Sequence, residues 1–295
     1  MLLRSPYTLA NNRPLQAGNT DIYVLTFKVT LSLEAGDGNG DNAYSECGAT
    51  NGTGNPISGE GLFNQSALDR DANGSVDETS EDCGDLPYII HEKNLISVTP
   101  NNDDTYTIRY EISAENIGGA TGSYTLIDRP QYDDDVVIES ATLLGAGSLT
   151  GTEWIIADGQ ALNAGDDVTY TIEVVVSLSL EPGDGNGDNT YNECDANGNG
   201  QPQPMEGLFN ESLLDRNDDG TYEETDTVCN DLPYIIFEKN YIGVQANPNG
   251  TYDVEYEIIA ENLGGATGTY TITDEPQYDD DIVINAANVN GTPLG

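Results

Sequence analysis

The chain has 295 residues, of which 52 are acidic and only 9 are basic. A surface this negative repels nucleic acid and anionic lipid, and it repels itself unless bound cations or salt reduce the charge. No run of residues approaches the ~18 apolar residues of a membrane span, so we expect no membrane insertion. Disorder is also disfavoured, because 17 tyrosines and many Val and Ile residues stand in alternating runs.

The sequence repeats itself after about one half of its length. Tyr23 corresponds to Tyr170, 147 residues later, and the string PQYDDD at 130–135 returns at 276–281, 146 residues later. Within this repeat an acidic cassette occurs twice, from Asp37 to Cys83 and from Asp184 to Cys229. Each cassette begins with GDGNGDN, passes a first cysteine, GLFN and LDR, and ends at a second cysteine.

The four cysteines form one pair in each cassette. They lack CxxC spacing, and the chain has a single histidine, so a zinc site is disfavoured. Evenly repeated cysteines are typical of disulfides in an oxidising compartment. The sequence therefore predicts disulfides Cys47–Cys83 and Cys194–Cys229, and an extracellular location.

Oxygen-bearing side chains recur at every second residue after each LDR string. Their spacing follows positions 1, 3, 5, 7 and 9 of an EF-hand calcium loop, with glycine at position 6. The twelfth position is Ser80 or Asp226 instead of Glu, and no helical pattern flanks the loops, so a standard EF-hand is excluded. A solvated acidic hairpin without an ion remains the alternative. The predicted Ca²⁺ ligands in these loops are Asp69, Asp71, Asn73, Ser75 and Asp77, and Asp215, Asn217, Asp219, Thr221 and Glu223.

The GDGNGDN strings offer further oxygen ligands. We expect the disulfide to bring each string toward the LDR loop, where it would share a site with a glutamate next to the first cysteine; the alternative is a loop without a ligand. The predicted ligands are Asp37, Asn39, Asp41 and Glu46, and Asp184, Asn186, Asp188 and Glu193. PQYDDD is a lesser candidate for a metal or partner contact, because most such runs only cap a turn in water.

Residues 86–231 form the one module that is present whole. Period-two alternation predicts seven strands, at 86–98, 105–116, 123–128, 136–144, 153–157, 168–180 and 207–215. No segment has helical periodicity, so the expected fold class is all-β: tandem immunoglobulin-like β-sandwich modules with the cassette at the end of the last two strands. Residues 1–85 then carry the last three strands and the cassette of one module, and 232–295 carry the first four strands of another.

The succession YEISAENIGGATGSYTLIDRP, ALNAGDDVTYTIEVVVSL and LFN resembles the conserved repeat domain of prokaryotic cell-surface proteins. In that family an Asn-x-Gly turn follows the second strand and an Ala-Gly-Asp turn precedes the sixth, as at 116–118 and 164–166 here. The partial modules have these turns at 262–264 and 17–19, the last with Asn19 in place of Asp. The resemblance implies tandem immunoglobulin-like modules, surface display, and a stalk, fibre or adhesin role without common catalytic residues.

Half of a sandwich exposes apolar faces and strand edges to water. Either the sequence is a window from a longer tandem array, or the C-terminal half of one subunit is completed by the N-terminal half of the next, which builds filaments head to tail. We therefore expect a structural subunit of an extracellular filament or cell-surface stalk and not an enzyme, with copies of itself or neighbouring repeats as partners. The alternatives are an adhesin for a glycan or protein ligand, and an accessory region of a secreted hydrolase. His91, which Phe237 replaces in the repeat, is expected to serve packing or to lie at the surface and not to act as a general base.

Overall fold

The computed structural model describes residues 6–36, 40–49, 54–196 and 198–293, and all of their regular secondary structure is β. The chain divides into two compact units, residues 1–231 and 232–295. Among the described residues, none belongs to a helix with the length and hydropathy needed to cross a membrane.

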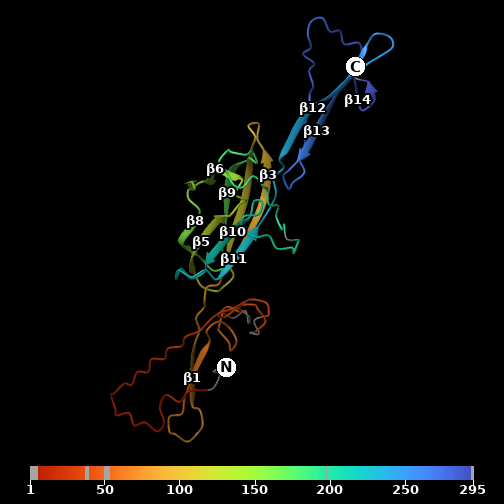
Figure 1. Cartoon of the computed structure of the whole chain (residues 1–295). Coiled ribbons are helices and arrows are strands. Elements are labelled where there is room, and N and C mark those ends of the chain that lie inside the picture. The colour runs from red at the N-terminus through yellow and green to blue at the C-terminus, as the bar shows by residue number, and fades with distance from the viewer. Residues whose placement is uncertain (1–5, 37–39, 50–53, 197, 294–295) are drawn as a thin grey trace. The chain divides into compact units, whose positions relative to one another are not determined.

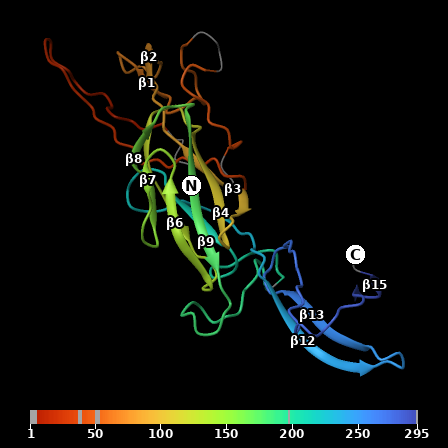
Figure 2. The same ribbon diagram turned by 90° about the horizontal axis from the view of Figure 1, so that it is seen from above.

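Residues 86–231 fold into a β-sandwich of two antiparallel sheets (Figure 1). The first sheet has the order β3 (Ile89–Pro100), β4 (Thr105–Asn116), β9 (Asp167–Leu178), β6 (Val136–Leu143) and β7 (Gly147–Ser148). The second sheet has the order β11 (Glu224–Val228), β10 (Asn210–Asp215), β5 (Gly122–Pro130) and β8 (Trp154–Leu162). In Figure 2 the strands β3, β4, β9 and β6 lie side by side in this order.

The core lies between the two sheets and is formed by the apolar side chains that occupy every second position of the strands. In β4 the side chains of Ile108, Tyr110 and Ile112 are fully buried, whereas Arg109 between them is exposed. Tyr110 pairs across the sheet with Ile172 of β9, which is also fully buried. Alternate residues of a strand point to opposite faces, so one apolar set packs inward while the polar set meets water.

All seven strands predicted within 86–231 are present, and the strand at 105–116 has the predicted bounds. The prediction that 207–215 is the last strand was wrong, because β11 follows it and pairs with β10 from Asn210↔Val228 to Leu214↔Glu224. The short segment ETDTV has too few apolar residues to reveal a strand, and it gains its conformation from pairing with β10. The two-residue strand β7 was also not predicted.

The partial modules contain fewer strands than predicted. In residues 6–85 the structure describes one exposed hairpin, β1 (Asn64–Leu68) with β2 (Glu78–Asp82). In residues 232–293 it describes β12 (Ile235–Ala246) with β13 (Tyr252–Asn262), and β14 (Asn288–Val289) with β15 (Thr292–Pro293). The segments that correspond to β8 and β9 in the first part, and to β5 and most of β6 in the second, are not strands. A strand needs a hydrogen-bonded neighbour. In the whole module β9 pairs with β4 and β6, and β8 pairs with β5, so each of these segments lacks the partner that the other half supplies.

Candidate metal centre

The loop that joins β10 to β11, residues 215–223, closes around the carboxylate of Asp215. This carboxylate is 2% exposed and accepts hydrogen bonds from the backbone N–H groups of Asp219 (3.1 Å) and Gly220 (2.7 Å). Gly220 has a φ of 86°, which lets the chain turn back sharply. Carboxylate oxygens of Asp215, Asp219 and Glu223 all lie within 4.8 Å of one another. Three carboxylates converging on one point form the ligand set that a hard cation such as Ca²⁺ prefers.

The corresponding loop of the first cassette has the same arrangement. Asp69 accepts hydrogen bonds from the N–H groups of Asn73 (3.1 Å) and Gly74 (2.7 Å). Carboxylate oxygens of Asp69, Asp71 and Asp77 lie within 4.8 Å of one another. The N–H of Gly74 is the largest of the causes that lower the pKa of Asp69, so this carboxyl stays ionised and available to a cation.

The remaining predicted ligands of these loops hold the loop backbone. Asn73 Oδ1 accepts the N–H of Ser75 (2.8 Å), and Asp219 accepts that of Thr221 (3.0 Å) in the second copy. The side-chain amide of Asn217 donates to Glu223 (3.4 Å). In these contacts Ser75 and Thr221 take part through their backbone N–H groups.

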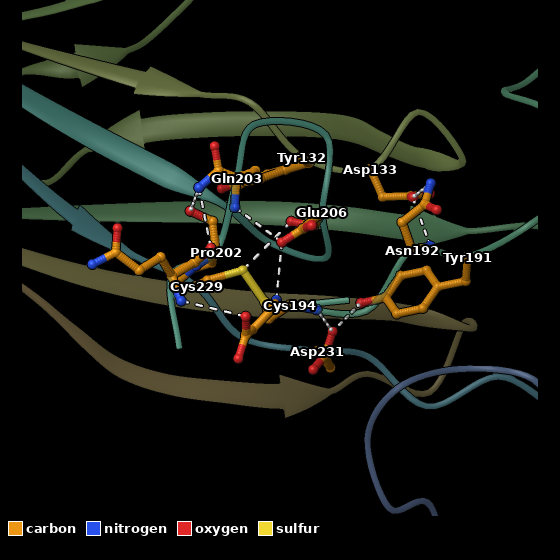
Figure 3. The surroundings of a disulfide bond; sticks show 12 residues. Tyr132, Asp133, Tyr191, Asn192, Cys194, Pro202, Gln203, Glu206, Cys229 and Asp231 are labelled. Carbon is orange, nitrogen blue, oxygen red and sulfur yellow. Dashed lines mark hydrogen bonds between the residues drawn. A yellow bond between two sulfur atoms is a disulfide. The ribbon is translucent and has the colours of Figure 1, made fainter. Parts of the chain in front are cut away.

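Both predicted disulfides, Cys47–Cys83 and Cys194–Cys229, are present. They indicate a secreted or extracellular protein, since such bonds persist in oxidising compartments. Figure 3 shows the second disulfide with Glu206, whose carboxylate accepts the N–H groups of Asp195 (2.9 Å) and Gln203 (2.9 Å). In the first cassette Glu60 likewise accepts the N–H of Gly48 (2.7 Å). The two cassettes therefore share one local structure, in which a buried glutamate organises the loop after the first cysteine.

The expected sharing of ligands between GDGNGDN and the LDR loop is wrong for the second cassette. Cys229 follows the end of β11 that pairs with Asn210, whereas the loop 215–223 lies at the opposite end of the same hairpin. Asp184, Asp188 and Glu193 are exposed. In the first cassette Asp41 and Glu46 are exposed as well, and Asp37 and Asn39 lie outside the described residues.

The second GDGNGDN string instead contacts the acidic turn at 133–135. The N–H of Asn189 donates to Asp135 Oδ1 (3.1 Å), and Asn192 donates its N–H (2.9 Å) and its side-chain amide (3.0 Å) to Asp133 Oδ2. Figure 3 shows Asn192 directed at Asp133. Gly187 approaches so closely that a Cβ there would lie 2.2 Å from Asp135 Oδ1. PQYDDD, the lesser candidate in the sequence, therefore forms a second cluster with residues of the cassette.

This second cluster contains buried carboxylates and buried oxygens without hydrogen-bond donors in the described part of the chain. Asp133 is 1% exposed and Asp135 is fully buried, and burial raises the pKa of both carboxyls. Asp135 Oδ2 and Asn189 Oδ1 are buried and have no hydrogen-bond partner among the described residues. Buried acceptors without donors are costly, and a bound cation satisfies them. The fit of a metal is thus supported by the unpartnered oxygens as well as by the carboxylate cluster.

The sequence alone did not suggest Asn189 as a ligand. It lies 54 residues from Asp135 and reaches it only through the fold. The available signal was the recurrence of both strings, GDGNGDN and PQYDDD, at the same repeat interval. In the second unit Asp279, Asp280 and Asp281 form the corresponding cluster and are exposed.

A groove of about 580 Å³ lies beside this acidic turn. Arg129, Tyr132, Glu153 and Glu211 contribute to its lining. Arg129 forms an ion pair with Glu153 (2.6 Å) there. Arg129 also lies 3.5 Å from Glu211, so one arginine faces two glutamates and the lining stays net negative.

Comparison with known protein families finds no match to this chain. No curated protein matches it either. One solved structure, a β-glucosidase involved in saponin metabolism from intestinal bacteria, is similar over 48% of this chain and 16% of that chain, at 18% identity and a TM-score of 0.21. The chain thus spans about a sixth of that structure, and a TM-score this low carries no argument about fold or function. The resemblance to the conserved repeat domain stays a prediction.

Proposed function

We propose that the chain is a structural subunit of an extracellular filament or cell-surface stalk, built of calcium-stabilised, immunoglobulin-like β-sandwich repeats. In this proposal, half-modules complete each other head to tail. One observation carries it: the two partial modules expose the apolar side chains that the whole module buries. Leu25 and Tyr256 are each 42% exposed, whereas their counterparts Ile172 and Tyr110 are fully buried.

The register of the whole module predicts how the halves fit. Tyr110 of β4 lies opposite Ile172 of β9, so Tyr256 of β13 is expected opposite Leu25 of the completing segment. Phe27 and Val29, each 53% exposed, would then occupy the places of Val174 and Val176, which are fully buried. The completing segment becomes a strand because it gains the hydrogen-bonded neighbour that it lacks alone.

Completion would gain free energy by burying an apolar face. Leu25, Phe27 and Val29, whose counterparts are buried, are each about half exposed. Full burial of three such side chains contributes roughly 4.5–9 kcal/mol, and about half of that remains available from their present exposure. Burial of the matching face on β13 adds a similar amount, against which stand the entropy losses of association and ordering.

Calcium would make such an assembly compatible with 52 acidic residues. The loop 215–223 and the cluster of Asp133, Asp135 and Asn189 lie at two different places of the same module. Cations there neutralise carboxylates that otherwise repel, and they fix loops that β-strands alone do not order. The expected affinity is that of extracellular modules, roughly 10⁻⁴–10⁻³ M.

Electron microscopy of the 295-residue chain in millimolar calcium tests completion between copies. We expect filaments from the wild type, none from Leu25→Asp, and filaments again from the matched control Val24→Asp. Val24 is 86% exposed, and its counterpart Thr171 is not part of the buried core. Adjacent strand residues face opposite sides, so only Leu25 should matter. A wild-type chain that stays monomeric, or equal behaviour of the two variants, contradicts the proposal.

A further inference from the structure

The core of the sandwich contains a lysine and an aspartate in contact with each other. The side chains of Lys93 in β3 and Asp128 in β5 are both 0% exposed, and Lys93 Nζ contacts Asp128 Oδ2. Burial lowers the pKa of Lys93 and raises the pKa of Asp128. Both directions disfavour the charged pair and favour the neutral amine and the protonated carboxylic acid.

An asparagine side chain completes this cluster. Asn210 is fully buried. It lies two residues before Ser212 in β10, and Ser212 pairs with Asp128 of β5. Asn210 and Asp128 therefore lie on the same face of the sheet. The Asn210 amide is near enough to Asp128 and Tyr110 to influence the pKa of both. Lys93 Nζ lies 4.8 Å from the ring centre of Tyr110. Lys93 and Asn210 thus share Asp128 and Tyr110 as neighbours.

The polar atoms of the cluster are poorly satisfied as they stand. Neither Oδ1 nor Nδ2 of Asn210 has a hydrogen-bond partner of normal geometry among the described residues, and Asp128 Oδ1 also lacks one. Tyr110 and Tyr132, whose hydroxyls are 3.1 Å apart, close the site from water. Leaving several buried polar atoms unpaired costs about 1–3 kcal/mol each, so a packing role alone is a poor explanation for these three residues.

We propose that Lys93 and Asn210 form an intramolecular isopeptide bond, with Asp128 as the proton carrier. The neutral Nζ attacks Cγ of Asn210, and a C–N bond forms while the carbonyl electrons move to Oδ1. Asp128 donates its proton to the oxyanion and takes one from the new ammonium group. It then gives a proton to Nδ2 as the Cγ–Nδ2 bond breaks, and takes the proton of the Oδ1 hydroxyl as the Cγ–Oδ1 double bond re-forms. The products are a secondary amide and one molecule of ammonia, and no oxidant, reductant or cofactor takes part.

Asn210 and not Asp128 is the acceptor, because the reaction needs an acid to carry protons between the amine and the leaving group. Attack on Asn210 keeps Asp128 free for that task. Attack on Asp128 would consume the one carboxylic acid that contacts Lys93 Nζ in the described structure. The reaction happens once in each core and involves no external substrate.

The same three residue types recur in the partial modules. Lys239 contacts Asp274 and lies 4.7 Å from the ring centre of Tyr256, as Lys93 lies over Tyr110. The counterpart of Asn210 is Asn64, which is exposed in β1. If the proposed completion between copies holds, Asn64 of one copy joins Lys239 and Asp274 of the next, and an amide forms between subunits. This second bond rests on the proposed function, whereas the bond within 86–231 does not.

Intact-mass measurement of the reduced, denatured full chain tests the bond within the module. We expect the wild type to be lighter than its sequence by one ammonia for each bond formed. A proteolytic digest should give a branched peptide that contains Lys93 and Asn210, with no tryptic cleavage after Lys93. The Asn210→Ala variant should have its full calculated mass, and so should Asp128→Ala, which would lose no ammonia. A wild type of full mass overturns the proposal without need of any variant, and a loss of water overturns the choice of Asn210.

Denaturing electrophoresis of calcium-grown assemblies distinguishes the second bond from the first. A ladder of covalent multimers that disappears in Asn64→Ala supports the bond between copies. Ammonia loss without a ladder refutes the bond between copies and leaves the bond within the module standing. Filaments with neither a ladder nor ammonia loss refute both bonds while the filament proposal survives.

Discussion

Removing two carboxylates from the loop 215–223 should reduce stabilisation by calcium without unfolding the module. In the double variant Asp219→Asn/Glu223→Gln, the side-chain carbonyls can still accept the N–H groups of Thr221 and Arg216. The first cassette already has asparagine, Asn73, at the position of Asp219. We therefore expect the stability in a chelator to change by no more than about 0.5 kcal/mol, as for ordinary surface substitutions.

The size of the calcium effect follows from linkage. At about 10 mM calcium, a site with a dissociation constant of roughly 10⁻⁴–10⁻³ M stabilises the folded state by about 1.4–2.7 kcal/mol. For a module of about 150 residues this raises Tm by roughly 3–11 °C per site. The variant should lose the part of this rise in Tm that comes from calcium at the loop 215–223. It should keep the part that comes from calcium at the cluster around Asp135.

Thermal unfolding followed by circular dichroism, with calcium and with a chelator, measures this difference. The matched control is Glu139→Gln/Asp158→Asn, which removes two exposed carboxylates from β6 and β8 of the same module. The control should retain the full calcium-induced rise in Tm. An equal rise in the wild type and the loop variant would refute a cation at 215–223, and an equal loss in the control would show only a general charge effect.

Three further changes test other parts of the structure. Asp133→Asn/Asp135→Asn should be more stable than the wild type in chelator at about pH 7, because a buried carboxyl with a raised pKa loses stability as the pH rises through that pKa. Near pH 4 the difference in stability should shrink. Urea midpoints measure both, and they should also show that calcium no longer stabilises this cluster in the variant. Removing the disulfide with Cys194→Ala/Cys229→Ala should lower the free energy of unfolding by about 4 kcal/mol, given the sequence separation of 35 residues, and an unchanged urea midpoint contradicts this. Asn116→Ala breaks hydrogen bonds to two backbone N–H groups and two carbonyls and should cost roughly 3–5 kcal/mol. Asn116→Asp keeps the acceptor but turns a buried carboxylate oxygen toward the two carbonyls, so it should cost at least as much in the same assay.

The strands of the whole module were predictable because their side chains alternate regularly. In 105–116 the residues Tyr106, Ile108, Tyr110 and Ile112 stand at every second position on one face, the last three are buried, and the bounds of β4 agree with the pattern. The LDR loops were predictable for a similar reason, since all their oxygens lie within nine residues of one another. Local periodicity and local spacing are properties that a sequence displays directly.

Sites built from distant segments were not predictable in the same way. Asp135 and Asn189 meet only because β6 and the loop after β9 lie together. Lys93 reads as an ordinary polar position of an alternating strand, and only the fold shows its side chain at 0% exposure beside Asp128. The absence of the predicted strands from the described residues of the partial modules could not be predicted for the same reason. A strand forms only beside a partner strand, and the residue pattern of one segment does not show whether that partner is present.

Where β3 and β11 run together, the two sheets are joined by several contacts. His91 Nδ1 of β3 lies 3.6 Å from Glu224 Oε1 of β11, and a hydrogen bond from a backbone N–H lies beside it. The N–H of Lys93 donates to the carboxylate of Asp226 (2.7 Å), the residue at the place where an EF-hand would carry its last ligand. Both strands are the outermost of their sheets, so each would otherwise offer an edge to any passing strand. With this seam covered and carrying negative charge, neighbouring molecules have little to pair with at this side of the sandwich. In the proposed assembly, this side would therefore favour growth along the axis over lateral pairing.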